Sequence, residues 1–306
     1  MGHPGGHTVR IFIADSDGGY RQPSRILGQF VDNLAEWTGA REAVRVQWPT
    51  PGKVNPRRSH TWESAAAAGV ADVSRLVRLH PSDPLVLIGV CSGTRVIYDW
   101  MDAHPEDLDR VVAVGMIGDP YRPRDRWLDG TPDPGGQGVA GLRRGPIPER
   151  THWVSVPGDP LSGVLPDRLL KGVVRASTLA PDQVYDELLE DLPDTRPRLA
   201  ARLKLAQQPA QWSPQLLRRL DDAVAVLTTY REREYAAMYE SGEDGASPLT
   251  RLAAAIVDLV AARDREGGGD SGQSGDGGVA GHGLGSGAGW SHGARPQLSE
   301  YASGLA

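Results

Sequence analysis

The fold can be worked out from the stretch Pro84-Leu85-Val86-Leu87-Ile88-Gly89-Val90-Cys91-Ser92-Gly93-Thr94-Arg95. A short apolar run typical of a strand ends in the pattern Gly-x-Cys-x-Gly, and a helical pattern begins at once. This order is typical of a nucleophile elbow, a strand-to-helix turn so sharp that glycine is needed on both sides of its central residue. The central residue is Cys91, the only cysteine of the chain.

Two alternatives to this interpretation stay open. Glycine patterns of this length arise by chance, so the stretch can also be an ordinary turn between a strand and a helix. Ser92 can be proposed as the nucleophile instead, but Val90 and Thr94 would then stand where the turn needs glycine. The N–H groups and dipole at the start of the new helix favour a thiolate and an oxyanion. We therefore predict Cys91 as the nucleophile and the N–H of Ser92 as an oxyanion donor.

Length and composition restrict the class of protein. The chain has 306 residues, enough for one large α/β domain with an appendage. A net charge of −6 argues against a nucleic-acid partner held through phosphate contacts. One cysteine allows no internal disulfide, so folding needs no oxidising compartment. We see no secretory signal at the start and no apolar run of membrane-spanning length, so no transmembrane anchor is expected.

Strand-like and helix-like segments alternate through the first half of the chain. The alternation predicts an α/β fold with a doubly wound, mostly parallel sheet. Functional residues of such sheets gather at the carboxyl ends of the strands, where Cys91 also falls. The expected strands are residues 9–14, 44–48, 85–90, 111–117 and 152–156, and the expected helices are residues 24–38, 61–80 and 92–104.

Three further residues are candidates for the site. The loop after the first strand can supply a second oxyanion donor, with Ser16 as its candidate, although a plain turn is equally consistent with it. Asp159 follows the strand at 152–156, where the acid of a nucleophile–acid–histidine triad falls in chain order. Asp119, at the end of the preceding strand, is the rival acid. Either aspartate can simply belong to a turn, since each precedes a proline.

The second half of the chain divides into segments of different composition. Helical periodicity dominates to residue 266, and its apolar stripes predict core contacts within a small helical subdomain. Glycine-rich low complexity follows and cannot bury a core. The predicted parts are a sheet domain at 8–160, a helical insertion at 161–266, a glycine-rich tract at 267–289 and a terminal segment at 290–306 that returns to the sheet domain.

A triad histidine has to follow the acid in the chain. Beyond Asp159 the only histidines are His282 and His292. His282 lies within the glycine-rich tract, where a catalytic base cannot be held in place. We therefore predict His292 as the base, and without a triad both histidines are solvent residues.

Taken together, these features resemble the cutinase-like α/β hydrolases. More narrowly, the chain resembles the lysin B enzymes of phages that infect mycobacteria and related actinobacteria. The order Cys91, Asp159, His292 carries the resemblance, together with a helical insertion between the last two. The similarity covers most of residues 8–265. The stretches that carry it are Leu87-Ile88-Gly89-Val90-Cys91-Ser92-Gly93, the helix at 64–79, Ile117-Gly118-Asp119-Pro120-Tyr121-Arg122 and Pro134-Gly135-Gly136-Gln137-Gly138-Val139-Ala140-Gly141.

The resemblance implies esterase chemistry on the cell envelope. Lysin B enzymes cleave the ester that joins mycolic acids to arabinogalactan late in phage infection, and they commonly lack a signal peptide. For this chain, the implied substrate is a lipid ester of the envelope, and no metal or organic cofactor is implied. We expect a monomer that is made in the host cytoplasm and acts at the envelope after release.

The chain departs from that family at the nucleophile, where the family has serine. A thiolate can also attack an ester, and the acyl thioester is then hydrolysed by water that His292 activates. The dienelactone hydrolases use a cysteine elbow of this kind. Two other functions stay open: a weak or inactive hydrolase-fold protein that binds envelope lipid, and a cysteine-dependent lactone or thioester hydrolase unrelated to cell walls.

Overall fold

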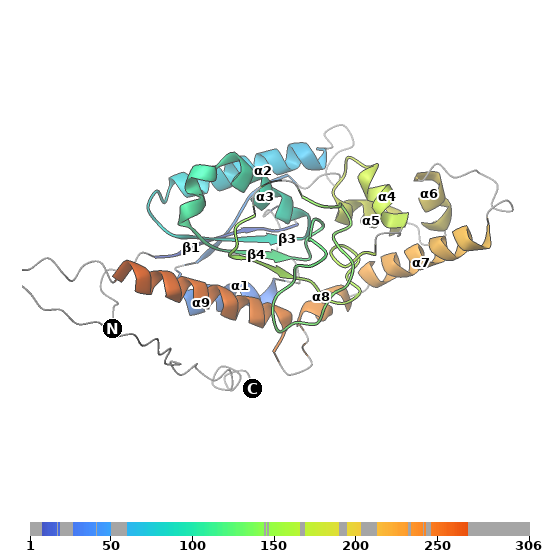
Figure 1. The fold of residues 1–306 in the computed structure, drawn as a ribbon. Coiled ribbons are helices and arrows are strands. Elements are labelled where there is room, and N and C mark those ends of the chain that lie inside the picture. Colours follow the sequence, from blue (N-terminus) through green and yellow to red (C-terminus); the bar gives the residue numbers. More distant parts are fainter. Residues whose placement is uncertain are drawn as a thin grey trace, which may run out of the picture. The chain divides into compact units, whose positions relative to one another are not determined.

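The structure is a computed structural model, and Figure 1 shows its fold. It describes residues 8–16, 18, 27–40, 42–49, 60–143, 145, 147–165, 169–189, 195–202, 213–231, 234–240, 242 and 246–268. The chain up to Gly268 forms one compact unit by its contacts, and this unit is the one described here. His282, His292 and the predicted terminal segment at 290–306 lie outside the described residues.

A five-stranded sheet forms the centre of this unit, with strand order β2-β1-β3-β4-β5 and every neighbouring pair parallel. The order is that of a doubly wound sheet, which confirms the predicted fold class. Edge strand β2 is shorter than predicted because the N–H of Trp48 binds the carbonyl of Gly18 in a loop instead of the ladder. The strands are β1 (Arg10–Ala14), β2 (Ala43–Arg45), β3 (Leu85–Val90), β4 (Val111–Ile117) and β5 (Thr151–Val154).

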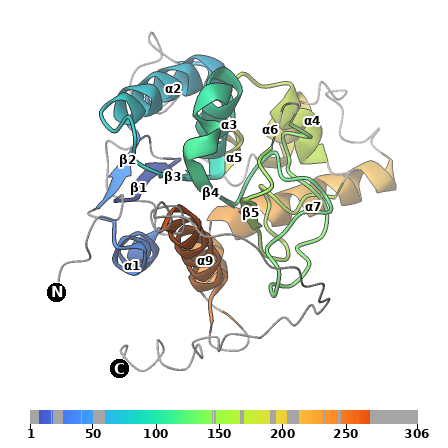
Figure 2. The ribbon, with the colours of Figure 1, turned by 60° about the vertical axis from the view of Figure 1, so that its left-hand side comes forward.

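Helices cover both faces of the sheet (Figure 2). Helices α2 (Trp62–Arg78) and α3 (Thr94–Ala103) lie on one face, and α1 (Gly28–Thr38) and α9 (Pro248–Gly268) lie on the other. All six residues of β3 and all seven of β4 are buried. Strands that are buried on both faces are continuously apolar, which is why these two could be recognised in the sequence.

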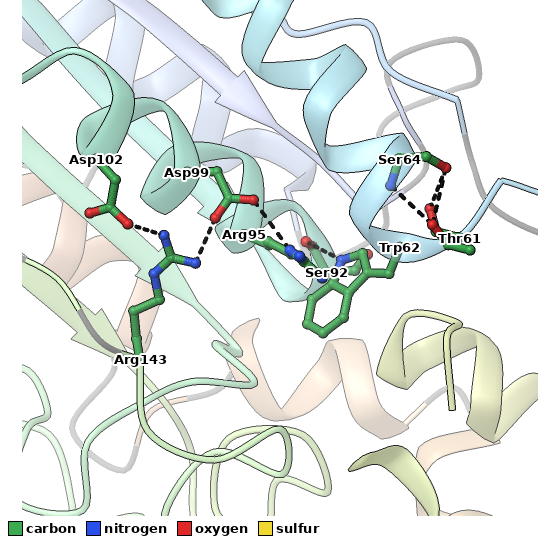
Figure 3. Close-up of polar contacts among 8 residues, drawn as sticks. All are labelled: Thr61, Trp62, Ser64, Ser92, Arg95, Asp99, Asp102 and Arg143. Atoms are coloured by element: carbon green, nitrogen blue, oxygen red, sulfur yellow. Dashed lines mark hydrogen bonds and ion pairs between the residues drawn. The ribbon is translucent and has the colours of Figure 1, made fainter. Parts of the chain in front are cut away.

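Helix α2 begins at a well-formed N-cap, drawn in Figure 3. The hydroxyl oxygen of Thr61 accepts the N–H of Ser64 at 3.1 Å. Small residues then let the helix approach its neighbour α3 closely. A methyl group added at Gly69 would lie 2.7 Å from a methyl carbon of Val96. The same methyl group would lie 3.1 Å from the Cβ atom of Trp48, in the segment after β2, so the helix is closely packed there as well.

Helix α9 differs from its expected place. Its apolar stripe predicted packing within the helical subdomain, but α9 contacts mainly α1 and β4, and it contacts β5 and α8 less extensively. Leu252 points at the sheet, since a methyl group added to Gly115 of β4 would lie 3.2 Å from its side chain. An amphipathic stripe tells which face of a helix is buried but not which partner buries it, and here the partner is the sheet.

The helices that precede α9 pack mainly on one another. Helix α7 contacts α4, α5 and α6, and α5 also contacts the turn that carries Cys91. Among the described residues, no helix is both long enough and apolar enough to cross a membrane. The helices of this group are α4 (Leu169–Arg175), α5 (Pro181–Leu189), α6 (Thr195–Arg202), α7 (Pro214–Arg231) and α8 (Glu234–Glu240).

Candidate functional site

Cys91 stands at the turn between β3 and α3. A short 3₁₀ turn, η2 (Cys91–Gly93), joins the end of the strand to the helix. The φ angle of Cys91 is 48°, and among the described residues it is the only non-glycine residue with positive φ. Such a backbone is strained for any residue that has a side chain, and it persists only where the surrounding structure imposes it. This is the geometry of a nucleophile elbow.

The two flanking glycines are required by space. A methyl group added at Gly89 would lie 2.7 Å from the Cα atom of Thr94, and one added at Gly93 would fall on the carbonyl oxygen of Ala14. The turn is therefore pressed against the carboxyl end of β1 and against its own helix. The steric pattern centres on Cys91 and not on Ser92, as the spacing of the glycines predicts.

The strain at Cys91 leads to a prediction that does not depend on activity. At most positions alanine is more stable than glycine, but at positive φ the preference reverses. We expect the Cys91→Gly protein to be more stable than the Cys91→Ala protein by about 1 kcal/mol. Chemical denaturation of both variants measures the difference. If the alanine variant is the more stable of the two, the backbone at residue 91 is not strained.

The loop after β1 lies beside the elbow, since a methyl group added at Gly93 would lie 3.2 Å from the carbonyl carbon of Asp15. The carboxylate of Asp15 is fully buried and accepts Nη2 of Arg45 at 3.0 Å. The carbonyl of Asp15 accepts the N–H of Gly18 at 3.0 Å, which forms a tight turn around Ser16. The position of this loop is compatible with an oxyanion donor, and the assignment of Ser16 to that role stays a prediction.

Asp159 lies buried in the turn after β5, 1% exposed. Its Oδ1 accepts the N–H groups of Leu161 and Ser162 at 2.7 and 3.2 Å. Its Oδ2 accepts the hydroxyl of Ser162 at 2.6 Å and that of Tyr239, which reaches it from α8. Burial raises the pKa of Tyr239, and the charges of Asp159 and Cys91 act in the same direction, so this phenol lies within electrostatic range of both groups. The role of Asp159 as the triad acid stays a prediction.

Asp119, the rival acid, is fully buried behind the elbow. Its carboxylate accepts Thr94 Oγ1 at 3.0 Å, Tyr98 Oη at 2.7 Å, Trp153 Nε1 at 3.1 Å and the N–H of Tyr121 at 2.9 Å. Burial raises the pKa of Asp119, although these donors act in the opposite direction. The carboxylate thus ties the first turn of α3 to β5 and to the loop after β4.

The predicted base His292 and its alternative His282 lie outside the described residues, so the histidine of the triad stays a prediction. The described histidines make their recorded contacts elsewhere. Nδ1 of His80 lies 3.4 Å from Oδ2 of Asp83, and Nε2 of His104 lies 2.8 Å from Oγ of Ser74. His152 is on β5, where burial lowers its pKa.

One group of possible metal ligands occurs among the described residues. His104, Glu106 and Asp107 place ligand atoms within 4.8 Å of one another. They follow the last residue of α3, whereas the elbow precedes its first residue. Nδ1 of His104 already lies 3.2 Å from Glu106, so the cluster is explained by pairing among its own members.

Asp182 is a site residue that the sequence did not indicate. It is 9% exposed at the start of α5, and its Oδ2 accepts the hydroxyl of Ser92 at 3.1 Å. Burial, with the charge of Asp186 as a smaller cause, raises its pKa to about 7. In the sequence, Pro181-Asp182 is an ordinary helix start with an acidic residue in the first turn. Nothing in that pattern distinguishes a buried acid.

A line of paired charges runs along α3 from the elbow (Figure 3). Nε1 of Trp62 donates to the carbonyl of Ser92 at 3.2 Å, and the guanidinium of Arg95 lies 4.9 Å from the centre of the Trp62 ring. Arg95 pairs with Asp99 at 3.2 Å, and Arg143 pairs with Asp99 at 2.6 Å. Arg143 also pairs with Asp102. Arg143 belongs to the long loop that joins β4 to β5, residues 118–150, which we call the rim loop. Its contacts with Asp99 and Asp102 fix this part of the rim loop to the helix that follows the elbow.

Arg122 is fully buried in the loop after β4. Its Nε donates to the carbonyl of Ser162 at 2.8 Å, and Nη1 donates to that of Arg126 at 2.8 Å. Nη2 donates to the carbonyls of Gly135 and Gly136 at 2.5 and 3.1 Å. Burial lowers the pKa of Arg122, and the charge of Asp159 is the largest opposing influence. One side chain thus joins the rim loop to the turn that holds Asp159.

No family model matches the chain, and no curated protein matches its sequence. Among solved structures, lysin B from Mycobacteriophage D29 is similar over 82% of this chain and 98% of its own, with a TM-score of 0.43 and 14% identity. The catalytic core domain of acetyl xylan esterase from Trichoderma reesei is similar over 65% of this chain and 98% of its own, with a TM-score of 0.38 and 14% identity.

A cutinase-like protein from Cryptococcus sp. is similar over 51% of this chain and 79% of its own, with a TM-score of 0.37 and 16% identity. Identities and TM-scores this low support no statement about activity or substrate. The fold is established by the strand order and by the turn at Cys91.

Proposed function

We propose that the chain is a carboxylic-ester hydrolase that uses the thiol of Cys91 as its nucleophile. The observation that carries this proposal is the strained conformation of Cys91. Backbone strain at a single non-glycine residue, held between two sterically required glycines, is a feature that proteins retain at functional positions. The one thiol of the chain occupies that position.

The proposed reaction has two acyl-transfer steps. In the first, the sulfur of Cys91 attacks the acyl carbon while His292 accepts the thiol proton, and His292 then protonates the leaving alcohol as the C–O bond breaks. The N–H of Ser92 and a donor from the loop around Ser16 stabilise the oxyanion. In the second, water activated by His292 attacks the thioester, which releases the acid and restores the thiol.

Asp159 would orient His292, but Tyr239 occupies one oxygen of this carboxylate in the structure. In the working state, therefore, the imidazole has to share Oδ2 with the phenol or displace it. The proposed substrate is a lipid ester of the lysin B type, between mycolic acids and arabinogalactan. The protein would be made in the host cytoplasm and would act at the envelope after release.

Ester turnover and its dependence on the thiol test this proposal. The intact chain is expected to hydrolyse a p-nitrophenyl ester, and prior treatment with iodoacetamide is expected to remove nearly all of that turnover. Because the chain has one cysteine, alkylation reports on Cys91 alone. Absence of turnover, or turnover that alkylation leaves intact, would refute thiol catalysis. Release of free mycolic acid from isolated mycobacterial cell walls then tests the substrate.

A second function is favoured by two specific observations. Asp159 is already held by Ser162 and Tyr239, and Cys91 is only 4% exposed. Both features suit a hydrolase-fold protein that binds envelope lipid without cleaving it. This alternative predicts sedimentation with mycolate-containing vesicles, no ester turnover, and no effect of His292→Ala on binding.

A further inference from the structure

The contact between Asp182 and Ser92 joins two segments that are far apart in the chain. Ser92 immediately follows Cys91 in the elbow, and Asp182 lies in the first turn of α5. Both side chains are buried, Ser92 being 1% exposed. The Ser92 hydroxyl donates to Asp182 Oδ2, and the other oxygen, Oδ1, has no hydrogen-bond partner in the described part of the chain. A buried carboxylate oxygen without a donor is costly, so a neutral, protonated Asp182 is favoured.

The surroundings of Asp182 offer it little positive charge. Asp186 lies one turn further along α5, and its charge raises the pKa of Asp182. On α7, the charges of both aspartates raise the pKa of Tyr230. The charges of Asp182 and Cys91 both raise the pKa of Tyr230, so this phenol lies within electrostatic range of the acid and the thiol. The carboxyl and the sulfur therefore share one buried region in which charge is weakly screened.

The helices that contact α5 also carry cations. These are Lys171 and Arg175 on α4, Arg196 and Arg198 on α6, and Arg218 and Arg219 on α7. None of them is among the groups with the largest influence on the pKa of Asp182. Those groups are Asp186, which raises this pKa, and the hydroxyl of Ser92 with the backbone N–H groups of Asp182 and Gln183, which lower it.

We propose that Asp182 is a positioning residue of the elbow, which Ser92 holds beside the thiol and whose charge controls how easily Cys91 ionises. This role of Asp182 concerns a reaction of the thiol, so the proposal rests on the proposed function. When Asp182 is neutral, thiolate and oxyanion form without an opposing charge. When it is ionised, its negative charge disfavours both. Since burial places this change near pH 7, the ionised carboxylate opposes formation of the thiolate above that pH.

The ionisation of the single thiol can be measured without any substrate. The ultraviolet absorbance of the thiolate is followed against pH, and the spectrum of the Cys91→Ser protein is subtracted at each point. We expect Asp182→Asn to lower the midpoint of the thiol by about one pH unit, because two charges in a weakly screened interior repel one another by that amount. Ser92→Ala is also expected to lower the midpoint of the thiol, but by less. Without the Ser92 hydroxyl as donor, Asp182 stays protonated to higher pH.

Asp186→Asn is the matched control. This change removes one negative charge from the same helix and keeps the hydrogen bond between Ser92 and Asp182. It is expected to shift the midpoint of the thiol by less than half of the shift in Asp182→Asn. An unchanged or higher midpoint in Asp182→Asn and in Ser92→Ala, with both variants folded by circular dichroism, would overturn the proposal. Because the titration needs no turnover, its outcome is independent of whether the chain hydrolyses esters. If the chain does, Asp182→Asn also removes an inflection near pH 7 from the kcat/KM profile.

Discussion

Replacing Cys91 by alanine is expected to lower kcat/KM for a p-nitrophenyl ester by at least about 10³-fold. Without the sulfur no acyl-enzyme can form, and only the oxyanion donors and substrate binding remain to assist attack by water. The remaining rate should not respond to iodoacetamide, because the chain then contains no thiol. Initial rates before and after alkylation, on protein whose thermal unfolding is cooperative, provide the measurement.

Cys91→Ser is the companion variant. It keeps an attacking atom at the elbow but replaces the thiol with a hydroxyl, which is much harder to deprotonate. We expect a rate between those of the alanine variant and the unmodified chain, together with full resistance to iodoacetamide. Undiminished turnover in the alanine variant would place the nucleophile elsewhere and leave the elbow as a structural turn.

Replacing Arg122 by methionine is expected to reduce the free energy of unfolding by about 3–5 kcal/mol. The methionine fills part of the space, but it donates no hydrogen bond to the carbonyls of Ser162, Arg126, Gly135 and Gly136. Each of these carbonyls would lose its guanidinium donor. Water cannot easily take the place of that donor, because Arg122 is fully buried. Urea denaturation followed by circular dichroism measures the loss.

The control for this change is Arg124→Met, two residues along the same loop. Arg124 is exposed, so loss of its guanidinium should alter the free energy of unfolding by less than about 0.5 kcal/mol. If both variants are equally stable, the buried guanidinium does not hold the loops together, and the hydrogen bonds seen around it contribute little.

The parts of this fold that could be predicted are those that local sequence determines. Strands β3 and β4 were recognisable because burial on both faces makes them continuously apolar. The elbow was recognisable because only glycine fits at residues 89 and 93. Local patterns of this kind need no knowledge of the distant chain.

The parts that could not be predicted depend on which distant segments meet. Tyr239 contacts Asp159 across 80 residues of chain, and Ser92 contacts Asp182 across 90. A tyrosine or an aspartate near a helix end carries no mark of such a partner. The place of α9 was missed for the same reason, since its apolar stripe suits a sheet as well as another helix.

Arg122 has one more consequence, for the way in which a substrate can enter. Its guanidinium ties the loop after β4 to the turn of Asp159 through several hydrogen bonds. The phenols of Tyr185 and Tyr239 hold the same turn from α5 and α8, each through one hydrogen bond. If the proposed substrate is to reach Asp159, one of these contacts has to open, and a single phenol bond opens at lower cost than the bonds of the buried guanidinium.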